Sequence, residues 1–120
     1  MKQTILLIED NEQNRYLAKF LLEKSNYQVE QAVSGQEGIE MAKKLRPTLI
    51  LLDIQLPGMD GHAVAAAIRE IPYLMDTPMI AVTSYAMVGD REKCLASGCN
   101  SYIEKPINPN TFIQEIAQFL

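Results

Sequence analysis

The chain has 120 residues, of which 48% are hydrophobic and 22% charged, a size and balance typical of one globular domain with its own core. Its net charge of −4 excludes sequence-independent binding to nucleic acid, which requires a basic surface. No apolar run approaches the ~18 residues of a membrane-spanning helix, and no signal peptide precedes the first apolar run. We therefore predict a single domain over residues 1–120, with no binding to membranes and no direct binding to nucleic acid.

Strand-like and helical patterns alternate five times along the chain. Apolar, β-prone runs predict strands at residues 5–8, 48–53 and 79–82, and a last strand is expected at residues 101–104. In residues 28–32, Val29 alternates with polar neighbours, which predicts a short strand nearer an edge of the sheet. Helical patterns follow them at residues 11–21, 34–45, 61–71, 90–97 and 108–120. Strict alternation with short connections is typical of a parallel sheet with helices on both faces, so we predict an α/β fold.

Local signals indicate where several of these helices begin and end. Ser34 and Glu37 predict a capping box at the start of the second helix, and Asn108 before a proline is expected to cap the last one. Gly98 is expected at the C′ position of the fourth helix. Apolar stripes predict the residues that face the core, which are Leu17, Phe20 and Leu21 in the first helix and Gly38, Ala42 and Leu45 in the second.

Two cysteines and a single histidine carry no recognisable motif. Cys94 and Cys99 match the spacing of no zinc or redox site, and two ligands are too few for a structural zinc ion. We expect both cysteines to be small, buried thiols in a reducing cytoplasm. His62, at the start of a predicted helix, is expected to be solvated.

Polar and charged residues stand at the ends of four of the five predicted strands. They are Glu9 and Asp10 after the first strand, Asp53 at the end of the third, Thr83 after the fourth and Lys105 after the fifth. The carboxyl ends of parallel strands lie at one edge of the sheet, where ligands bind in folds of this class. We therefore expect three carboxylates, a hydroxyl group and an ammonium group to meet at that edge.

These groups suit phosphoryl transfer. Neighbouring carboxylates repel one another, and a divalent cation such as Mg²⁺ removes that repulsion. Lys105 adds a positive charge for a phosphate oxygen, and Thr83 adds a hydroxyl donor. A carboxylate can itself attack phosphorus, and Asp53 is the expected nucleophile because it is central and precedes a turn rich in Pro and Gly.

Other classes of phosphate-handling protein fit the sequence less well. The chain contains neither G-x-x-x-x-G-K-[ST] nor G-x-G-x-x-G, which excludes the P-loop and the dinucleotide-binding fingerprint. Enzymes of the haloacid-dehalogenase type also form an aspartyl phosphate, but they typically have a second Asp two residues later, where this chain has Gln55. We therefore expect a long-lived phosphoryl group and a signalling switch rather than an enzyme with rapid turnover.

Along its whole length the chain resembles the receiver domain of two-component response regulators. The matching residues are Glu9-Asp10, Asp53, Pro57-Gly58-Met59-Asp60-Gly61, Thr83 and Lys105-Pro106. The resemblance implies a flavodoxin-like, doubly wound sheet of five parallel strands in the order 2-1-3-4-5. It also implies that a sensor histidine kinase or a histidine phosphotransfer domain donates a phosphoryl group to Asp53.

The resemblance further implies a metal site. Asp10 and Asp53 would bind Mg²⁺ or Mn²⁺ together with the main-chain carbonyl of Gln55, and Glu9 would act mostly through water. The protein would then be no enzyme in the usual sense, but a phosphoacceptor that catalyses only its own phosphorylation and slow dephosphorylation.

The same resemblance assigns a switch. Lys105 would bind the phosphoryl group and precede a cis Pro106. Thr83 and Tyr102 match the family's switch pair, in which the threonine hydroxyl is recruited by the phosphoryl group and the tyrosine rotates inward. The surface formed by the fourth helix, the fifth strand and the fifth helix would then change shape for an unknown downstream protein.

Positions beside these residues are expected to control water access. Gln55 and Tyr85 would influence the rate of dephosphorylation, and Tyr85 would partly shield the site. Ser84 stands where the family usually has a small residue, a variation expected to be harmless. The oligomeric state stays open between a monomer and a weak, phosphorylation-dependent homodimer.

Three alternatives remain at the level of sequence. A phosphorylation-independent interaction module would lack acidic or lysine positions, and none is missing. A phosphohydrolase is a second alternative, against which Gln55 argues. The domain is either free-standing or part of a longer response regulator or hybrid histidine kinase, and the start at Met1 favours a natural N-terminus.

Overall fold

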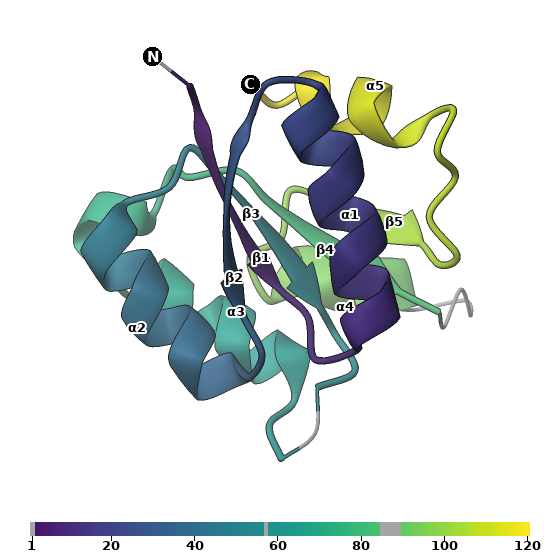
Figure 1. Ribbon diagram of the computed structural model, residues 1–120. Helices are drawn as coiled ribbons and strands as arrows, with labels where there is room; N and C mark the ends of the chain where they lie inside the picture. Colours follow the sequence, from purple (N-terminus) through teal and green to yellow (C-terminus); the bar gives the residue numbers. More distant parts are fainter. Residues whose placement is uncertain (1, 57, 85–89) are drawn as a thin grey trace.

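The computed structural model describes residues 2–56, 58–84 and 90–120. Its centre is a parallel sheet of five strands in the order β2-β1-β3-β4-β5, which confirms the predicted α/β fold and strand order (Figure 1). The strands are β1 (Thr4–Ile8), β2 (Gln28–Ala32), β3 (Leu49–Asp53), β4 (Met79–Thr83) and β5 (Ser101–Glu104). β3 and β4 are buried along their whole length, as their apolar runs predicted.

Helices cover both faces of the sheet (Figure 1). They are α1 (Glu12–Lys24), α2 (Gly35–Leu45), α3 (Gly61–Arg69), α4 (Asp90–Ala96) and α5 (Phe112–Ala117), with the 3-10 turn η1 (Pro72–Leu74) before β4. α1 and α5 pack on one face, where Leu22 and Phe112 are buried, whereas α2, α3 and α4 contribute to the core on the other face. Within the described residues, no helix is both long enough and apolar enough to cross a membrane.

Side chains alternate between these two cores along the central strands. In β1, Leu6 and Ile8 belong to the core beneath α2, α3 and α4, whereas Ile5 and Leu7 belong to the core beneath α1 and α5. Successive side chains of a strand point to opposite faces, so a strand covered on both sides needs apolar residues at every position. In β1 and β3, carboxylates therefore come only where each strand ends, at one edge of the sheet.

The predicted helix caps are confirmed in part. Oγ of Ser34 accepts a hydrogen bond from the N–H of Glu37 at 3.2 Å. The carboxylate of Glu37, however, accepts from the N–H of Val33 at 2.7 Å instead of closing the capping box on Ser34. Gly98 has a φ of +115° just after α4, and its N–H donates to the carbonyl of Leu95, as expected of a C′ residue.

The predicted start of the last helix is wrong. α5 begins at Phe112, several residues after Asn108. The side chain of Asn108 accepts a hydrogen bond from the N–H of Asn110 at 2.9 Å, and this contact forms a local turn in place of a helix cap.

The predicted core stripes of α1 and α2 are also partly wrong. In α1, Ala18 and Leu22 are buried, whereas Phe20 is 52% exposed. In α2, Leu45 is 38% exposed and Ile39 is buried instead. Apolar residues cover more than one side of both helices, so periodicity alone does not select the side that meets the sheet.

His62 is not the solvated residue that the sequence suggested. Its Nδ1 lies 3.1 Å from Oδ1 of Asp60, and its Nε2 lies 3.6 Å from Sγ of Cys94, so the ring connects the start of α3 to α4. Cys94 and Cys99 are both buried thiols that are not joined in a disulfide, as predicted.

Candidate functional site

The carboxyl edge of the sheet collects the side chains that were expected there. Glu9 and Asp10 directly follow β1, Asp53 is the last residue of β3, Thr83 is the last residue of β4 and Lys105 directly follows β5. β1, β3 and β4 are neighbours in the sheet, so their ends meet without any large excursion of the chain.

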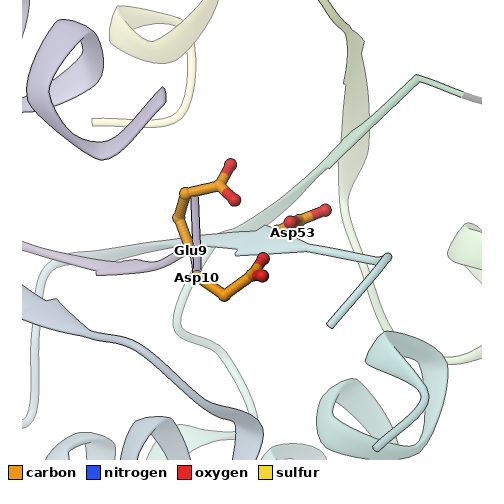
Figure 2. Close-up of side chains that lie close together, drawn as sticks. All are labelled: Glu9, Asp10 and Asp53. Carbon is orange, nitrogen blue, oxygen red and sulfur yellow. The ribbon is translucent and has the colours of Figure 1, made fainter. Parts of the chain in front are cut away.

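Glu9, Asp10 and Asp53 form a compact acidic cluster. Figure 2 shows Glu9 and Asp10 projecting from the end of β1 and Asp53 from the end of β3. One carboxylate oxygen from each lies within 4.8 Å of the others. Glu9 and Asp53 are buried and Asp10 is exposed, so the cluster is accessible from the side of Asp10. Closely spaced carboxylate oxygens are the donor set that Mg²⁺ and Mn²⁺ prefer, and the residues present therefore fit such an ion.

Lys105 is the counter-charge of this cluster. Its ammonium nitrogen lies 3.0 Å from Oε1 of Glu9 and 3.2 Å from Oδ2 of Asp53, and its side chain is largely buried. When Glu9 and Asp53 are both ionised, they and one ammonium group leave a net negative charge before the exposed Asp10 is added. This excess negative charge favours the binding of a cation.

The protonation of the cluster follows from burial and charge. Burial raises the pKa of the Glu9 carboxyl from 4.5 to about 7; the hydrogen bond and charge of Asp53 add to the rise, and Lys105 opposes it. Burial lowers the pKa of the Lys105 amine, but the hydrogen bond to Glu9 and the charges of both carboxylates outweigh burial, so the net shift is upward. Lys105 is therefore a permanent cation at neutral pH, whereas the Glu9 carboxyl takes up or releases its proton near neutral pH.

Arg15 holds the main chain of the acidic pair, a role that no sequence motif indicated. Its Nη1 donates to the carbonyl of Glu9 at 3.2 Å and to the carbonyl of Asp10 at 3.0 Å. The N–H of Asn11 also donates to Oε2 of Glu9 at 3.2 Å. The one available signal was the position of Arg15 on the first turn of the helix that follows Glu9 and Asp10.

Gln55 lies directly beside Asp53. Its N–H donates to Oδ1 of Asp53 at 2.9 Å. Its side-chain oxygen, Oε1, accepts from the N–H of Ser84 at 3.2 Å and from the hydroxyl of Ser84 at 2.5 Å. The presence of Ser84 was expected to be a harmless variation. Its contacts with Gln55 make it, after Arg15, a second residue of the site that sequence patterns did not identify.

The residues expected to form the switch lie on neighbouring strands. Thr83 is buried, and its main-chain oxygen accepts the N–H of Lys105 at 2.8 Å. Tyr102 pairs with Ala81 in the sheet and packs partly against the core beneath α2, α3 and α4, with the guanidinium of Arg91 5.9 Å from its ring centre. Ala81 and Thr83 are two residues apart on β4, so Thr83 and Tyr102 point to the same face of the sheet.

Two further expectations complete the set of predicted site residues. The peptide bond between Lys105 and Pro106 is cis. Tyr85 lies outside the described residues.

Comparison with known proteins agrees with this arrangement. A family model described as the response regulator receiver domain matches residues 5–117. The polar-differentiation response regulator DivK of Brucella anthropi is 40% identical over 120 residues, which covers 100% of this chain and 98% of the relative. DivK of Brucella ovis matches with the same identity and coverage.

Solved structures give the same result. The receiver domain of the sensor histidine kinase PA1611 from Pseudomonas aeruginosa PAO1, which has a magnesium ion coordinated in its active-site cleft, is 36% identical with a TM-score of 0.89, over 98% of this chain and 96% of that chain. The chemotaxis response regulator CheY4 of Vibrio cholerae is 26% identical with a TM-score of 0.95, over 100% of both chains. The chain belongs to the family of response regulator receiver domains and has their flavodoxin-like fold.

Proposed function

We propose that this domain is a phosphorylation-controlled signalling switch in which Asp53 accepts a phosphoryl group. The observation that carries the proposal is the contact of Lys105 with Asp53, 3.2 Å from ammonium nitrogen to carboxylate oxygen, inside a cluster with Glu9 and Asp10. A buried carboxylate that serves only the fold needs one partner, and additional carboxylates beside it add repulsion. The arrangement is better suited to binding a cation and a phosphoryl group together.

The donor would be a phosphohistidine of a sensor histidine kinase or of a histidine phosphotransfer domain. A carboxylate oxygen of Asp53 attacks phosphorus, the P–N bond breaks, and the departing imidazole nitrogen retains the electron pair and takes up a proton. The product is a carboxyl–phosphate anhydride on Asp53. Lys105 neutralises charge on the phosphoryl oxygens during the transfer, which lowers the barrier most where water is excluded.

Asp10 and Asp53 would hold Mg²⁺ or Mn²⁺ together with the main-chain carbonyl of Gln55, and Glu9 would act mostly through water. The ion, when bound, neutralises the negative charge of the carboxylates and of the incoming phosphoryl group. Arg15 supports this site indirectly, because it holds the backbone of Glu9 and Asp10 in place.

Gln55 supports a switch over a phosphohydrolase. It is neither acid nor base, so it supplies no group to activate a water molecule, and its side-chain oxygen already accepts two hydrogen bonds from Ser84. The domain would therefore catalyse only its own phosphorylation and slow dephosphorylation, with the rate tuned by Gln55 and Tyr85.

Phosphorylation would change the shape of the surface formed by α4, β5 and α5. Thr83 and Tyr102 point to the same face of the sheet as α4, so recruitment of the Thr83 hydroxyl by the phosphoryl group would be felt by Tyr102. We propose that the altered surface binds a downstream protein in the cytoplasm. The domain would act as a monomer or as a weak, phosphorylation-dependent homodimer, and it would not contact nucleic acid directly.

The proposal is tested by phosphorylation with phosphoramidate, a small donor that needs no partner kinase, followed by intact-mass measurement. Wild-type protein with Mg²⁺ is expected to gain one phosphoryl group, and wild-type protein with excess EDTA is not. Asp53→Asn should gain none, whereas Asp76→Asn, which changes an exposed aspartate, should behave as the wild type.

Other outcomes assign other functions. No Mg²⁺-dependent gain of mass, together with no binding of beryllofluoride, would overturn the proposal in favour of a phosphorylation-independent interaction module. Steady release of inorganic phosphate with no accumulation of phosphorylated protein would favour a phosphohydrolase.

A further inference from the structure

A polar bridge between Gln55 and Ser84 joins the two chain segments that leave β3 and β4. One side-chain oxygen of Gln55 accepts both the N–H of Ser84 at 3.2 Å and its hydroxyl at 2.5 Å. Ser84 is exposed and Gln55 is half-buried, so the bridge lies at the rim of the acidic cluster.

Both ends of the bridge are attached to groups of the site. Gln55 donates its N–H to Oδ1 of Asp53 at 2.9 Å, and Ser84 follows Thr83, whose main-chain oxygen accepts from Lys105 at 2.8 Å. A continuous set of hydrogen bonds therefore runs from the carboxylate of Asp53 through Gln55 to Ser84.

The bridge continues the connection between the strands beyond the sheet. The pairing of β3 with β4 ends at the hydrogen bond from the N–H of Ile54 to the carbonyl of Val82, 3.1 Å long. The two bonds to Gln55 add a link one step further toward the site.

We propose that the Gln55–Ser84 bridge is a positioning device that couples the metal and phosphoryl site to Ser84 at the end of β4 and to the helix α4 that follows it in the chain. This inference rests on the proposed role of Asp53 and goes beyond it. The bridge holds the main chain of Gln55, whose N–H faces Asp53, in a fixed place relative to β4. Any change of Asp53 that shifts Gln55 is transmitted to Ser84, and by reciprocity any change at Ser84 alters the site.

The coupling through Gln55 is separate from that through Thr83. A change transmitted through the Thr83 hydroxyl begins at a side chain at the end of β4. A change transmitted through the bridge begins at the main chain of Gln55, after β3. A direct action of the Gln55 side chain on water would require no contribution from Ser84. If the bridge carries the coupling, the effects of substituting Gln55 and Ser84 must be non-additive, and a double-mutant cycle measures this non-additivity.

The test uses the full chain and four variants: Gln55→Ala, Ser84→Ala, the double variant, and the control Gln36→Ala. Gln36 is a matched control because it is also a glutamine with a side-chain polar contact, to Glu40 at 3.3 Å, but it lies on the exposed side of α2. Mn²⁺ affinity is measured by electron paramagnetic resonance, and amide chemical shifts of residues 91–96 are recorded with Mg²⁺ alone and with Mg²⁺ and beryllofluoride.

Gln55→Ala is expected to weaken Mn²⁺ binding about 3- to 10-fold, the effect of one or two hydrogen bonds, and Ser84→Ala about 2- to 3-fold because its N–H remains. The double variant should match Gln55→Ala. Beryllofluoride should shift the amides of residues 91–96 less in all three variants than in wild type. Gln36→Ala should leave every value unchanged.

Additive losses in the double variant, or unchanged affinity in both single variants, would overturn the inference. An effect of Gln55→Ala on the lifetime of phosphorylated protein without any effect of Ser84→Ala would assign Gln55 a direct role toward water instead. If the wild-type protein binds neither Mn²⁺ nor beryllofluoride, the proposed function fails. The coupling through the bridge is then tested by the amide chemical shifts of the metal-free protein. There, Gln55→Ala must shift the amides of Ser84 and residues 91–96, and unshifted amides would exclude the coupling.

Discussion

The ammonium nitrogen of Lys105 lies 3.2 Å from Oδ2 of Asp53, although β5 and β3 are separated in the sheet by β4. The long lysine side chain reaches past the end of β4 and also contacts Glu9 at the end of β1, 3.0 Å away. One residue thus joins three strand ends and compensates two buried carboxylates.

Lys105→Met is therefore expected to destabilise the protein without divalent cations. Removing one partner from a buried ion pair leaves uncompensated charge, and we expect a loss on the order of 3 kcal/mol at pH 8. Mg²⁺ should restore part of the loss, because it supplies positive charge to the same carboxylates. Urea unfolding with Mg²⁺ or with EDTA measures both effects. Lys44→Met, at an exposed position of α2, should change stability by less than about 0.5 kcal/mol, and an equal loss in both variants would contradict the assignment.

Glu9 predicts how stability depends on pH. Its pKa is about 7 in the folded protein, against 4.5 as the ordinary value, chiefly because it is buried. The protonated folded form is favoured, so this contribution to stability is complete below about pH 4.5 and is lost as the pH rises through about 7.

The unfolding free energy with EDTA should thus fall by a few kcal/mol between pH 5 and pH 8, on the order set by the shift in pKa. Because metal ligands must be deprotonated, Mg²⁺ should stabilise the protein more at pH 8 than at pH 5. Urea unfolding at a series of pH values checks this. Glu9→Gln should flatten the curve in this window, and a curve that keeps its slope in Glu9→Gln would assign the dependence to another group.

Arg15→Ala should weaken the metal site without touching a carboxylate. The guanidinium fixes the carbonyls of Glu9 and Asp10, and loss of a residue that orients ligands lowers metal affinity by about tenfold. Mn²⁺ titration followed by electron paramagnetic resonance measures the change. Lys19→Ala, one turn further along α1, removes a similar charge and should retain wild-type affinity. Equal affinities in wild type and Arg15→Ala would show that the clamp has no role in metal binding.

Gly61 and Gly58 form a matched pair in the segment after β3. A Cβ at Gly61 would lie 2.4 Å from Cα of Ile54 and 2.7 Å from its carbonyl oxygen, so Gly61→Ala forces the backbone apart and should cost about 3 kcal/mol. At Gly58, φ is +77°, and apart from its chain neighbours no described residue has an atom within 4 Å of an added Cβ, so Gly58→Ala should cost about 1 kcal/mol from backbone strain alone. Urea unfolding of the two variants tests the ranking, which a larger loss in Gly58→Ala would reverse.

Most of the fold followed from local patterns. Apolar runs and one alternating run, separated by helical periods, predicted five strands and their parallel arrangement, since each pattern is set within a few residues. The predictions were wrong where the burial of a side chain or the start of a helix depends on packing against residues far away in the sequence. Periodicity placed Phe20 and Leu45 toward the core, and both are exposed because the sheet selects which apolar side of a helix it covers. The Asn-Pro pattern predicts a helix cap at Asn108, but the side chain of Asn108 forms a turn before α5.

The chemical groups at the strand ends could be predicted from the order of residues alone: Glu9, Asp10 and Asp53 as carboxylates, Thr83 as a hydroxyl and Lys105 as an ammonium group. Local patterns suffice for this, because the polar residue that follows each apolar run can be read directly from the sequence. The partners that those groups meet became clear only in the folded protein. The reach of Lys105 across β4, the hold of Arg15 on the backbone after β1 and the bridge from Gln55 to Ser84 all join segments that local patterns treat separately. Such contacts depend on side-chain directions and on the packing of strands brought together by the hydrophobic core, which no local pattern records.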